Sequence, residues 1–351
     1  MFTTLGVLFP EAIMAIFNSD QAVIEHGASY LIIAACSYVF TAITFCYAAS
    51  LRSIGDTMLP MWASLAALLT NGVLNYGLIF GNLGFAPLGV KGAALATLMA
   101  RVLECFIIIM GTYVKKTPLA CKWSELFGAS KDLRKGLLTI TLPIIANEAC
   151  WGLANVTYAV IYGRIGTGAS AAMQICTTIL NLFTIITFGL ANAAVVMIGN
   201  EIGAGQENAG KEYAKKILRI SIFVGLIMGM ILAGASSAIV AMFHISDGVR
   251  RDAIMILLIY GAFMSIKVYN SVQIVGILRG GGDTKYGSVV QMLTLWFLGI
   301  PSAFVCAFFF HLPVYLVVLS TMTEEIVKLL ILKRRFRSQK WIHNVVEQFA
   351  A

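Results

Sequence analysis

Two charged residues, Glu148 and Lys267, lie inside long apolar stretches of this sequence. A charge that leaves water for apolar surroundings needs a compensating partner. Desolvation favours the protonated form of a carboxyl group, and a bound cation favours the ionised form. The chemistry indicated at Glu148 is therefore reversible binding of a proton or a cation. No nucleophile, acid–base pair or metal-ligand set recurs at a catalytic spacing, so we do not predict an enzyme or a metal site.

The composition indicates a membrane protein. Of the 351 residues, 59% are hydrophobic and 12% are charged, whereas soluble domains carry about 25% charged residues. Many uncharged runs reach the roughly 20 residues that a helix needs to cross a bilayer. Backbone groups in lipid must be satisfied within the chain, so these runs are expected to be helices. The net charge of +8 is explained by basic loops, and we predict no nucleic-acid partner.

We predict about ten membrane-spanning helices. The apolar segments are 2–17, 24–50, 59–81, 90–113, 137–163, 169–199, 216–243, 252–277, 286–309 and 312–332. Lysine and arginine gather at 115–135, 211–219 and 333–340, which fall on one side when the spans alternate. The positive-inside rule then predicts a multi-pass protein of the cell (plasma) membrane with both termini in the cytoplasm.

An internal repeat organises the chain. The motif "LRSIGDT" at 51–57 returns as "LRGGGDT" at 278–284, 227 residues later, and "AIMAIFNSD" at 12–20 returns as "AIVAMFHISD" at 238–247. The spans between the copies agree in number and direction, so we expect two parallel-repeat helical bundles. The second copy is preceded by about two helices that have no counterpart before the first. We therefore expect two six-helix lobes, of which the first lacks its first two helices.

The repeat and the basic stretches predict four parts. These are a partial N-terminal lobe at 1–114, a cytoplasmic linker at 115–135, a C-terminal six-helix lobe at 136–333 and a basic cytoplasmic tail at 334–351. Arg52 and Asp56, with Arg279 and Asp283, are expected to pin the two motif turns. Trp341 and Ile342 stand among the cations of the tail. The tail could lie on anionic lipid as an interfacial helix or be partly disordered, and both alternatives stay open.

Three motifs together resemble the multidrug and toxic compound extrusion transporters. They are the paired "LR…GDT" turns, "NGVLNYGLIFGNLGFAPLGVKGAALAT" at 71–97 and "GLANAAVVMIGNEIGAGQ" at 189–206. The resemblance implies two lobes that rock about a central cleft and export cationic or amphipathic small molecules in exchange for protons or sodium ions. In many relatives a coupling aspartate lies on the first helix, and no residue here can be assigned that role. No other cofactor is expected, and the chain is expected to be a monomer.

Glu148 is the main candidate for coupling. It lies about twelve residues into the expected span 137–163, which places it near the middle of the bilayer. Pro143 removes a backbone donor nearby and can kink the helix. The alternative is a structural carboxylate that is paired with a neighbour.

Lys267 is followed by Asn270 and Gln273 on adjoining faces of one helix. Lys267 is either a partner of Glu148 that substrate or protons release, or a lysine whose ammonium reaches the interface. Further polar and aromatic candidates for the cleft are Asn147, Trp151, Asn155, Gln174 and Asn181. Each amide is also a candidate for an ordinary interhelical hydrogen bond. Arg101 and Glu104 are expected to form a local ion pair.

Two other functions stay open at this point. One is a flippase for lipid-linked saccharides in the same superfamily. The other is a truncated product that inserts into the membrane and transports nothing.

Overall fold

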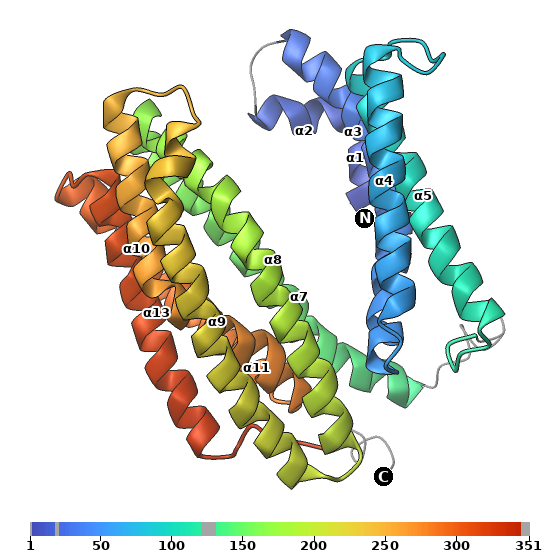
Figure 1. Cartoon of the computed structure of the whole chain (residues 1–351), viewed down its shortest axis with the longest axis vertical. Coiled ribbons are helices and arrows are strands. Elements are labelled where there is room, and N and C mark those ends of the chain that lie inside the picture. The colour runs from blue at the N-terminus through green and yellow to red at the C-terminus, as the bar shows by residue number, and fades with distance from the viewer. Residues whose placement is uncertain (1, 18–20, 121–130, 345–351) are drawn as a thin grey trace. The chain divides into compact units, whose positions relative to one another are not determined.

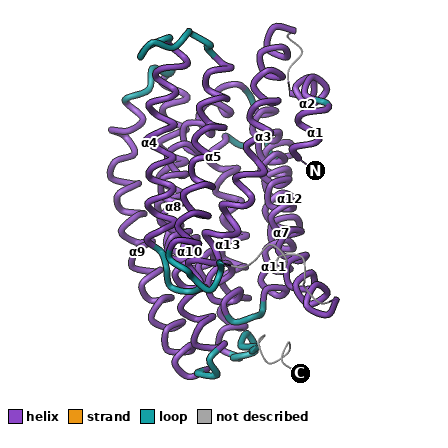
Figure 2. Tube along the Cα trace, turned by 90° about the vertical axis from the view of Figure 1, so that its right-hand side faces the viewer, coloured by secondary structure: helices purple, strands orange, loops and turns teal. Residues whose placement is uncertain are grey.

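The computed structural model describes residues 2–17, 21–120 and 131–344, and its regular elements are helices (Figure 1). Figure 2 shows helices joined by loops and no strand in these ranges. The chain divides by its packing into two compact units, Met1–Gly128 and Ala129–Ala351. The expectation of an all-helical polytopic membrane protein is confirmed.

The described residues of the first unit form five helices. They are α1 (Phe2–Leu8), α2 (Pro10–Phe17), α3 (Gln21–Ser53), α4 (Met58–Phe80) and α5 (Val90–Val114). Helix α5 packs along both α3 and α4. The buried carboxylate of Glu104 accepts hydrogen bonds from Arg101 and Ser64, both at 2.7 Å. The predicted ion pair of Arg101 and Glu104 is therefore confirmed.

The second unit holds the larger core. Its helices are α7 (Lys131–Ile165), α8 (Thr167–Gly203), α9 (Glu207–Ala241), α10 (Asp247–Ser271), α11 (Thr284–Thr294), α12 (Ile300–Phe304) and α13 (Val314–Arg337). Three π-helical segments continue them, namely η1 (Val272–Leu278), η2 (Leu295–Gly299) and η3 (Val305–Phe309). Wide π turns inside helices are frequent at functional sites. Helix α10 lies beside both α9 and α13 (Figure 1).

Eight helices of the described chain are long and apolar enough to cross a membrane, against the expected ten. The segment 2–17 was expected as one span and is two short helices instead. Pro10 has no N–H to donate to the preceding turn, so it begins a new helix. Helix α13 has 24 residues, a sufficient length at about 1.5 Å per residue. The charged residues of α13 nevertheless leave it out of these eight apolar helices.

Glycine residues lie at the contact between helices α9 and α10. A Cβ atom on Gly229 would overlap the carbonyl oxygen of Gly261, and one on Gly225 would lie 2.5 Å from Cα of Ser265. Small residues let two helix backbones approach closely, which strengthens the van der Waals packing between membrane helices.

We expect Gly229→Ala to lower the free energy of unfolding by about 1–3 kcal/mol, because the added methyl group separates α9 from α10. Gly234 on the same helix has open space around it and provides the control. Gly234→Ala should be neutral or stabilise by up to about 1 kcal/mol through helix propensity. Unfolding in mixed micelles measures both, and equal effects would contradict the packing explanation.

Candidate functional site

The two "LR…GDT" motifs form the same turn. Gly55 and Gly282 have φ angles of 89° and 83°, in the left-handed region that glycine tolerates best. In each motif the glycine N–H donates to the arginine carbonyl, and the aspartate N–H donates to the leucine carbonyl. The four bonds are Gly55–Arg52 (3.1 Å), Asp56–Leu51 (3.0 Å), Gly282–Arg279 (3.2 Å) and Asp283–Leu278 (2.8 Å). This is the Schellman ending of a helix, formed once in each unit.

Each motif aspartate binds a cation at the C-terminal end of another helix of its own unit, α5 or α13. Lys115, just after α5, donates to Asp56 Oδ2 at 2.7 Å, and Arg335 in α13 donates to Asp283 Oδ2 at 2.7 Å. The Lys115 ammonium and the N–H of Leu59 hold the pKa of Asp56 below its ordinary value. These contacts tie each motif turn to another helix of its own unit.

The tail after α13 folds back onto the second turn. Trp341 is 1% exposed and stacks on Phe336, with ring centroids 5.6 Å apart. The N–H of His343 donates to the carbonyl of Gly281 at 2.7 Å. As far as Asn344, the tail is neither an interfacial helix on lipid nor disordered. Its Trp341 is buried in protein instead. Residues 345–351 lie outside the described part of the chain.

We expect Trp341→Ala to release this tail. A lost contact of about 3 kcal/mol raises the population of the open tail roughly a hundredfold. Trypsin cleavage after Lys340 should accelerate accordingly. His343→Ala is the matched control, because His343 contributes its backbone and its side chain is exposed. Equal cleavage rates in both variants would show that Trp341 does not hold the tail.

Glu148 lies on α7 and pairs with the arginine of the second motif. Arg279 Nη2 donates to Glu148 Oε1 at 2.7 Å, and the Glu148 side chain is 56% exposed. Helix α7 runs from Lys131 to Ile165, and Glu148 lies at its midpoint along the chain. The expected position of Glu148 near the middle of the bilayer stays a prediction. The hypothesised Lys267–Glu148 pair is not formed.

Lys267 instead joins four further residues in a network between α10 and α13. We call these residues the ionic cluster: Lys267, Asn270, Glu324, Glu325 and Lys328. Both glutamates and Lys328 are less than 15% exposed at the side chain, and Lys267 is partly exposed. Two cations and two carboxylates leave the cluster neutral, as burial of charges in a low dielectric requires.

Glu325 is the centre of the ionic cluster. Asn270 Nδ2 donates to its Oε2 at 2.8 Å and to its backbone carbonyl at 2.9 Å. Lys267 and Lys328 each lie 3.4 Å from its Oε1. Lys328 also donates to Glu324 Oε1 at 2.6 Å. The Lys267 ammonium lies 5.3 Å from the ring centroid of Tyr260, which adds a cation–π contact.

Sequence reasoning missed three members of the ionic cluster, Glu324, Glu325 and Lys328. The signal was present, because all three fall inside the expected span 312–332. Charges four apart on a helix share a face and pair, as Glu324 and Lys328 do. Three charges within an apolar segment indicate a functional or structural network.

The remaining candidates separate into buried and exposed groups. Asn147 and Gln273 are buried, and each makes an interhelical hydrogen bond, to Gln291 at 3.4 Å and to the carbonyl of Leu332 at 2.7 Å. The exposed candidates are Trp151, Asn155, Gln174 and Asn181. Asn155 donates to the carbonyl of Trp151 within α7, at 2.8 Å.

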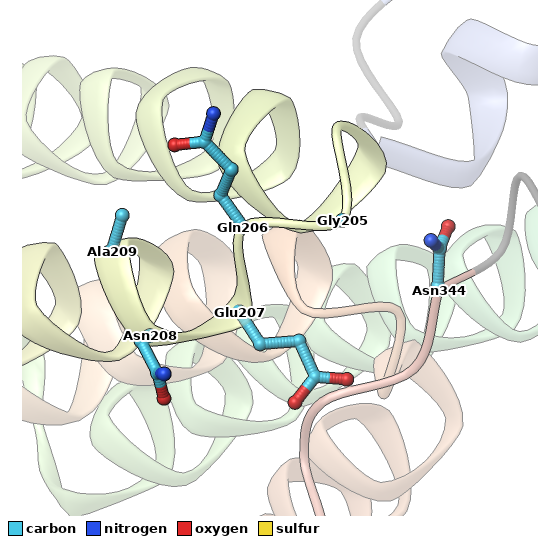
Figure 3. Close-up of a pocket in the computed structure, with 6 residues that line it drawn as sticks. All are labelled: Gly205, Gln206, Glu207, Asn208, Ala209 and Asn344. Atoms are coloured by element: carbon cyan, nitrogen blue, oxygen red, sulfur yellow. The ribbon is translucent and has the colours of Figure 1, made fainter.

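A surface hollow of about 540 Å³ lies at the turn between α8 and α9 (Figure 3). It is lined by Gly205, Gln206, Glu207, Asn208, Ala209 and Asn344. Small-molecule sites are mostly apolar with a few polar groups. This hollow is mostly polar and lies apart from the residues of the ionic cluster, so we assign it no ligand.

Long apolar helices that carry buried, balanced charges define a polytopic membrane protein. The sequence profile of the family MatE matches residues 1–77 and 143–329. The chain therefore belongs to the MatE family of multidrug and toxic compound extrusion transporters, and the predicted family is confirmed.

Individual relatives agree with this membership. The chain is 25% identical to the uncharacterized transporter YisQ of Bacillus subtilis, over 86% of this chain and 66% of that protein. It is 25% identical to the probable multidrug resistance protein NorM of Halalkalibacterium halodurans, over 89% and 68%. The chain thus spans about two thirds of the length of these curated relatives. A crystal structure of the Vibrio cholerae MATE transporter VcmN matches the fold with a TM-score of 0.87 at 14% identity, over 98% of this chain and 76% of that one.

Proposed function

We propose that the chain is a secondary active efflux transporter that exports cationic or amphipathic small molecules in exchange for protons or sodium ions. Membership of the MatE family supports the transport class. The observation that carries the coupling proposal is the ion pair between Glu148, a half-exposed carboxylate inside a membrane span, and Arg279 of the motif turn.

The pair gives a physical basis for exchange. A proton neutralises the Glu148 carboxylate, and a sodium ion or a cationic substrate competes with the Arg279 guanidinium for it. Either event weakens the link between α7 and the turn after η1. Pro143, inside α7, removes one helical hydrogen bond and makes that segment easier to bend. The mechanism thus joins cation binding to movement of one helix, as alternating access requires.

We propose two different roles for the exposed and the buried polar candidates. The exposed residues Trp151, Asn155, Gln174 and Asn181 are proposed to contact substrate. The buried amides Asn147 and Gln273 have interhelical partners and are proposed to hold helices together. Lys267 and Asn270 are proposed to hold Glu325 rather than to bind the coupling ion directly.

The test is transport by the purified chain in lipid vesicles. A cationic dye is added outside, and its accumulation is followed under an imposed proton gradient and, separately, under a sodium gradient. The proposal expects dye accumulation that depends on one of these gradients. Insertion without gradient-driven movement would favour a non-transporting product. Movement of a lipid-linked saccharide without dye transport would favour a flippase.

The parts, the orientation and the oligomeric state also belong to the proposal. We propose lobes at 1–114 and 136–333, a linker at 115–135, a tail at 334–351, a plasma-membrane location with both termini in the cytoplasm, and a monomer. The basic residues at 115–135 and 333–340 support this orientation.

A further inference from the structure

The two glutamates of the ionic cluster are held by different numbers of donors. Glu325 accepts hydrogen bonds from Asn270, Lys267 and Lys328. Among the described residues, Glu324 accepts one such bond, from Lys328 to Oε1. A carboxylate that accepts several donors keeps its charge, and one with a single donor gives it up more easily. Glu324 is therefore the carboxylate of the cluster that can change its protonation state.

Loss of the charge on Glu324 would not leave Lys328 without a carboxylate partner. Lys328 lies 2.6 Å from Glu324 Oε1 and also 3.4 Å from Glu325 Oε1, so it retains one carboxylate. The cluster would then carry one surplus positive charge. Two features can accept it, the Tyr260 ring beneath Lys267 and the buried Asn270 Oδ1, which accepts no hydrogen bond from any described residue.

The second oxygen of Glu324 and the hydroxyl of Tyr158 in α7 both lie beside Gly299, on the same side of η2. A Cβ atom on Gly299 would overlap both Glu324 Oε2 and Tyr158 Oη, so only glycine leaves room for both oxygens there. The Tyr158 hydroxyl is buried and has no hydrogen-bond partner among the described residues. A hydroxyl can donate to a carboxylate and can equally accept from a carboxylic acid. It can therefore serve Glu324 in either protonation state.

We infer that Glu324 is a reversible proton-binding site of the second unit, with Tyr158 as its hydrogen-bond partner beside Gly299. The ionisable groups that face it are Tyr158 from α7, Tyr260 and Lys267 from α10, and Glu325 and Lys328 from α13. The segments η2 and α12 contribute no ionisable side chain.

Proton uptake at Glu324 would change how α7 is held. A hydrogen bond to a carboxylate is roughly twice as strong as one between neutral groups. Protonation of Glu324 would replace its charged hydrogen bond with Tyr158, which joins α13 to α7, by a weaker neutral one. The proton site would therefore loosen the same helix that carries Glu148, at Tyr158, ten residues further along α7. The site belongs to the folded unit and is present whether or not the chain transports.

Infrared difference spectroscopy tests the site directly. The chain in lipid vesicles is moved from about pH 8 to about pH 5, and the C=O stretch of protonated carboxyl groups is recorded. We expect one such band to be lost in Glu324→Gln and kept in Glu104→Gln. Glu104 is the matched control, since it is a buried carboxylate in the first unit. A spectrum in which Glu324→Gln leaves every carboxyl band unchanged would overturn the inference.

A second variant keeps the test valid if Glu324→Gln fails to fold. Tyr158→Phe removes one hydroxyl from a buried ring and leaves its packing against Tyr162. Loss of the donor disfavours the ionised form of Glu324, so the midpoint of the carboxyl band should rise by about one pH unit. An unchanged midpoint and band position would show that Tyr158 and Glu324 do not interact. Dye transport measured on the same vesicles reports separately on the proposed function.

Discussion

Glu148→Gln is expected to abolish gradient-driven dye movement while the protein still inserts into vesicles. Glutamine keeps the shape of glutamate and cannot release a proton or balance a cation. Arg279 would then face a neutral amide in place of the carboxylate that lies 2.7 Å away. The measurement is dye accumulation at equal protein density, under the gradient that drives the unaltered chain, and the expected rate is that of empty vesicles.

Glu207→Gln is the matched control for this prediction. The Glu207 side chain is 54% exposed, against 56% for Glu148, and it pairs with Lys211 on the surface of α9. Surface pairs of this kind contribute about 0–1 kcal/mol, so transport should be unchanged. Full transport by Glu148→Gln would remove the coupling role of Glu148 and leave its contact with Arg279 as a structural pair.

Lys328→Met is expected to be among the most destabilising changes in the second unit. The substitution keeps the length of the side chain and leaves two buried carboxylates facing one remaining cation, Lys267. Removal of one partner from a buried ion pair typically costs about 3–5 kcal/mol, because the other charge stays buried without compensation. Reversible unfolding in mixed micelles measures the loss of unfolding free energy.

Two variants separate charge balance from simple disruption of α13. Lys333→Met removes an exposed cation from the same helix and should change the unfolding free energy by less than about 0.5 kcal/mol. The double variant Lys328→Met with Glu324→Gln restores neutrality in the ionic cluster. It should recover most of the lost stability, and no recovery would mean that charge balance is not what stabilises the site.

The sequence determined the class of structure. Apolar runs too long and too poor in charge for a soluble core had to be helices in a bilayer, and the repeated motif marked equivalent helix ends. The geometry of those ends was also foreseeable, since glycine after a helix favours the left-handed Schellman turn that Gly55 and Gly282 form. The Arg101–Glu104 pair followed from its spacing of three along one helix.

Partners that are far apart in the sequence were not foreseeable in this way. Glu148 is 131 residues from Arg279, and Lys267 is 58 residues from Glu325. Helical periodicity predicts only which side chains share a face of their own helix. Which faces then meet depends on the rotation and depth of each helix, and these are set by close contacts such as Gly229 on Gly261 and by the π turn that brings Gly299 to Glu324. The sequence by itself therefore determined that buried charges must be paired, and only the tertiary structure decided the pairs, because each pair depends on how separate helices pack.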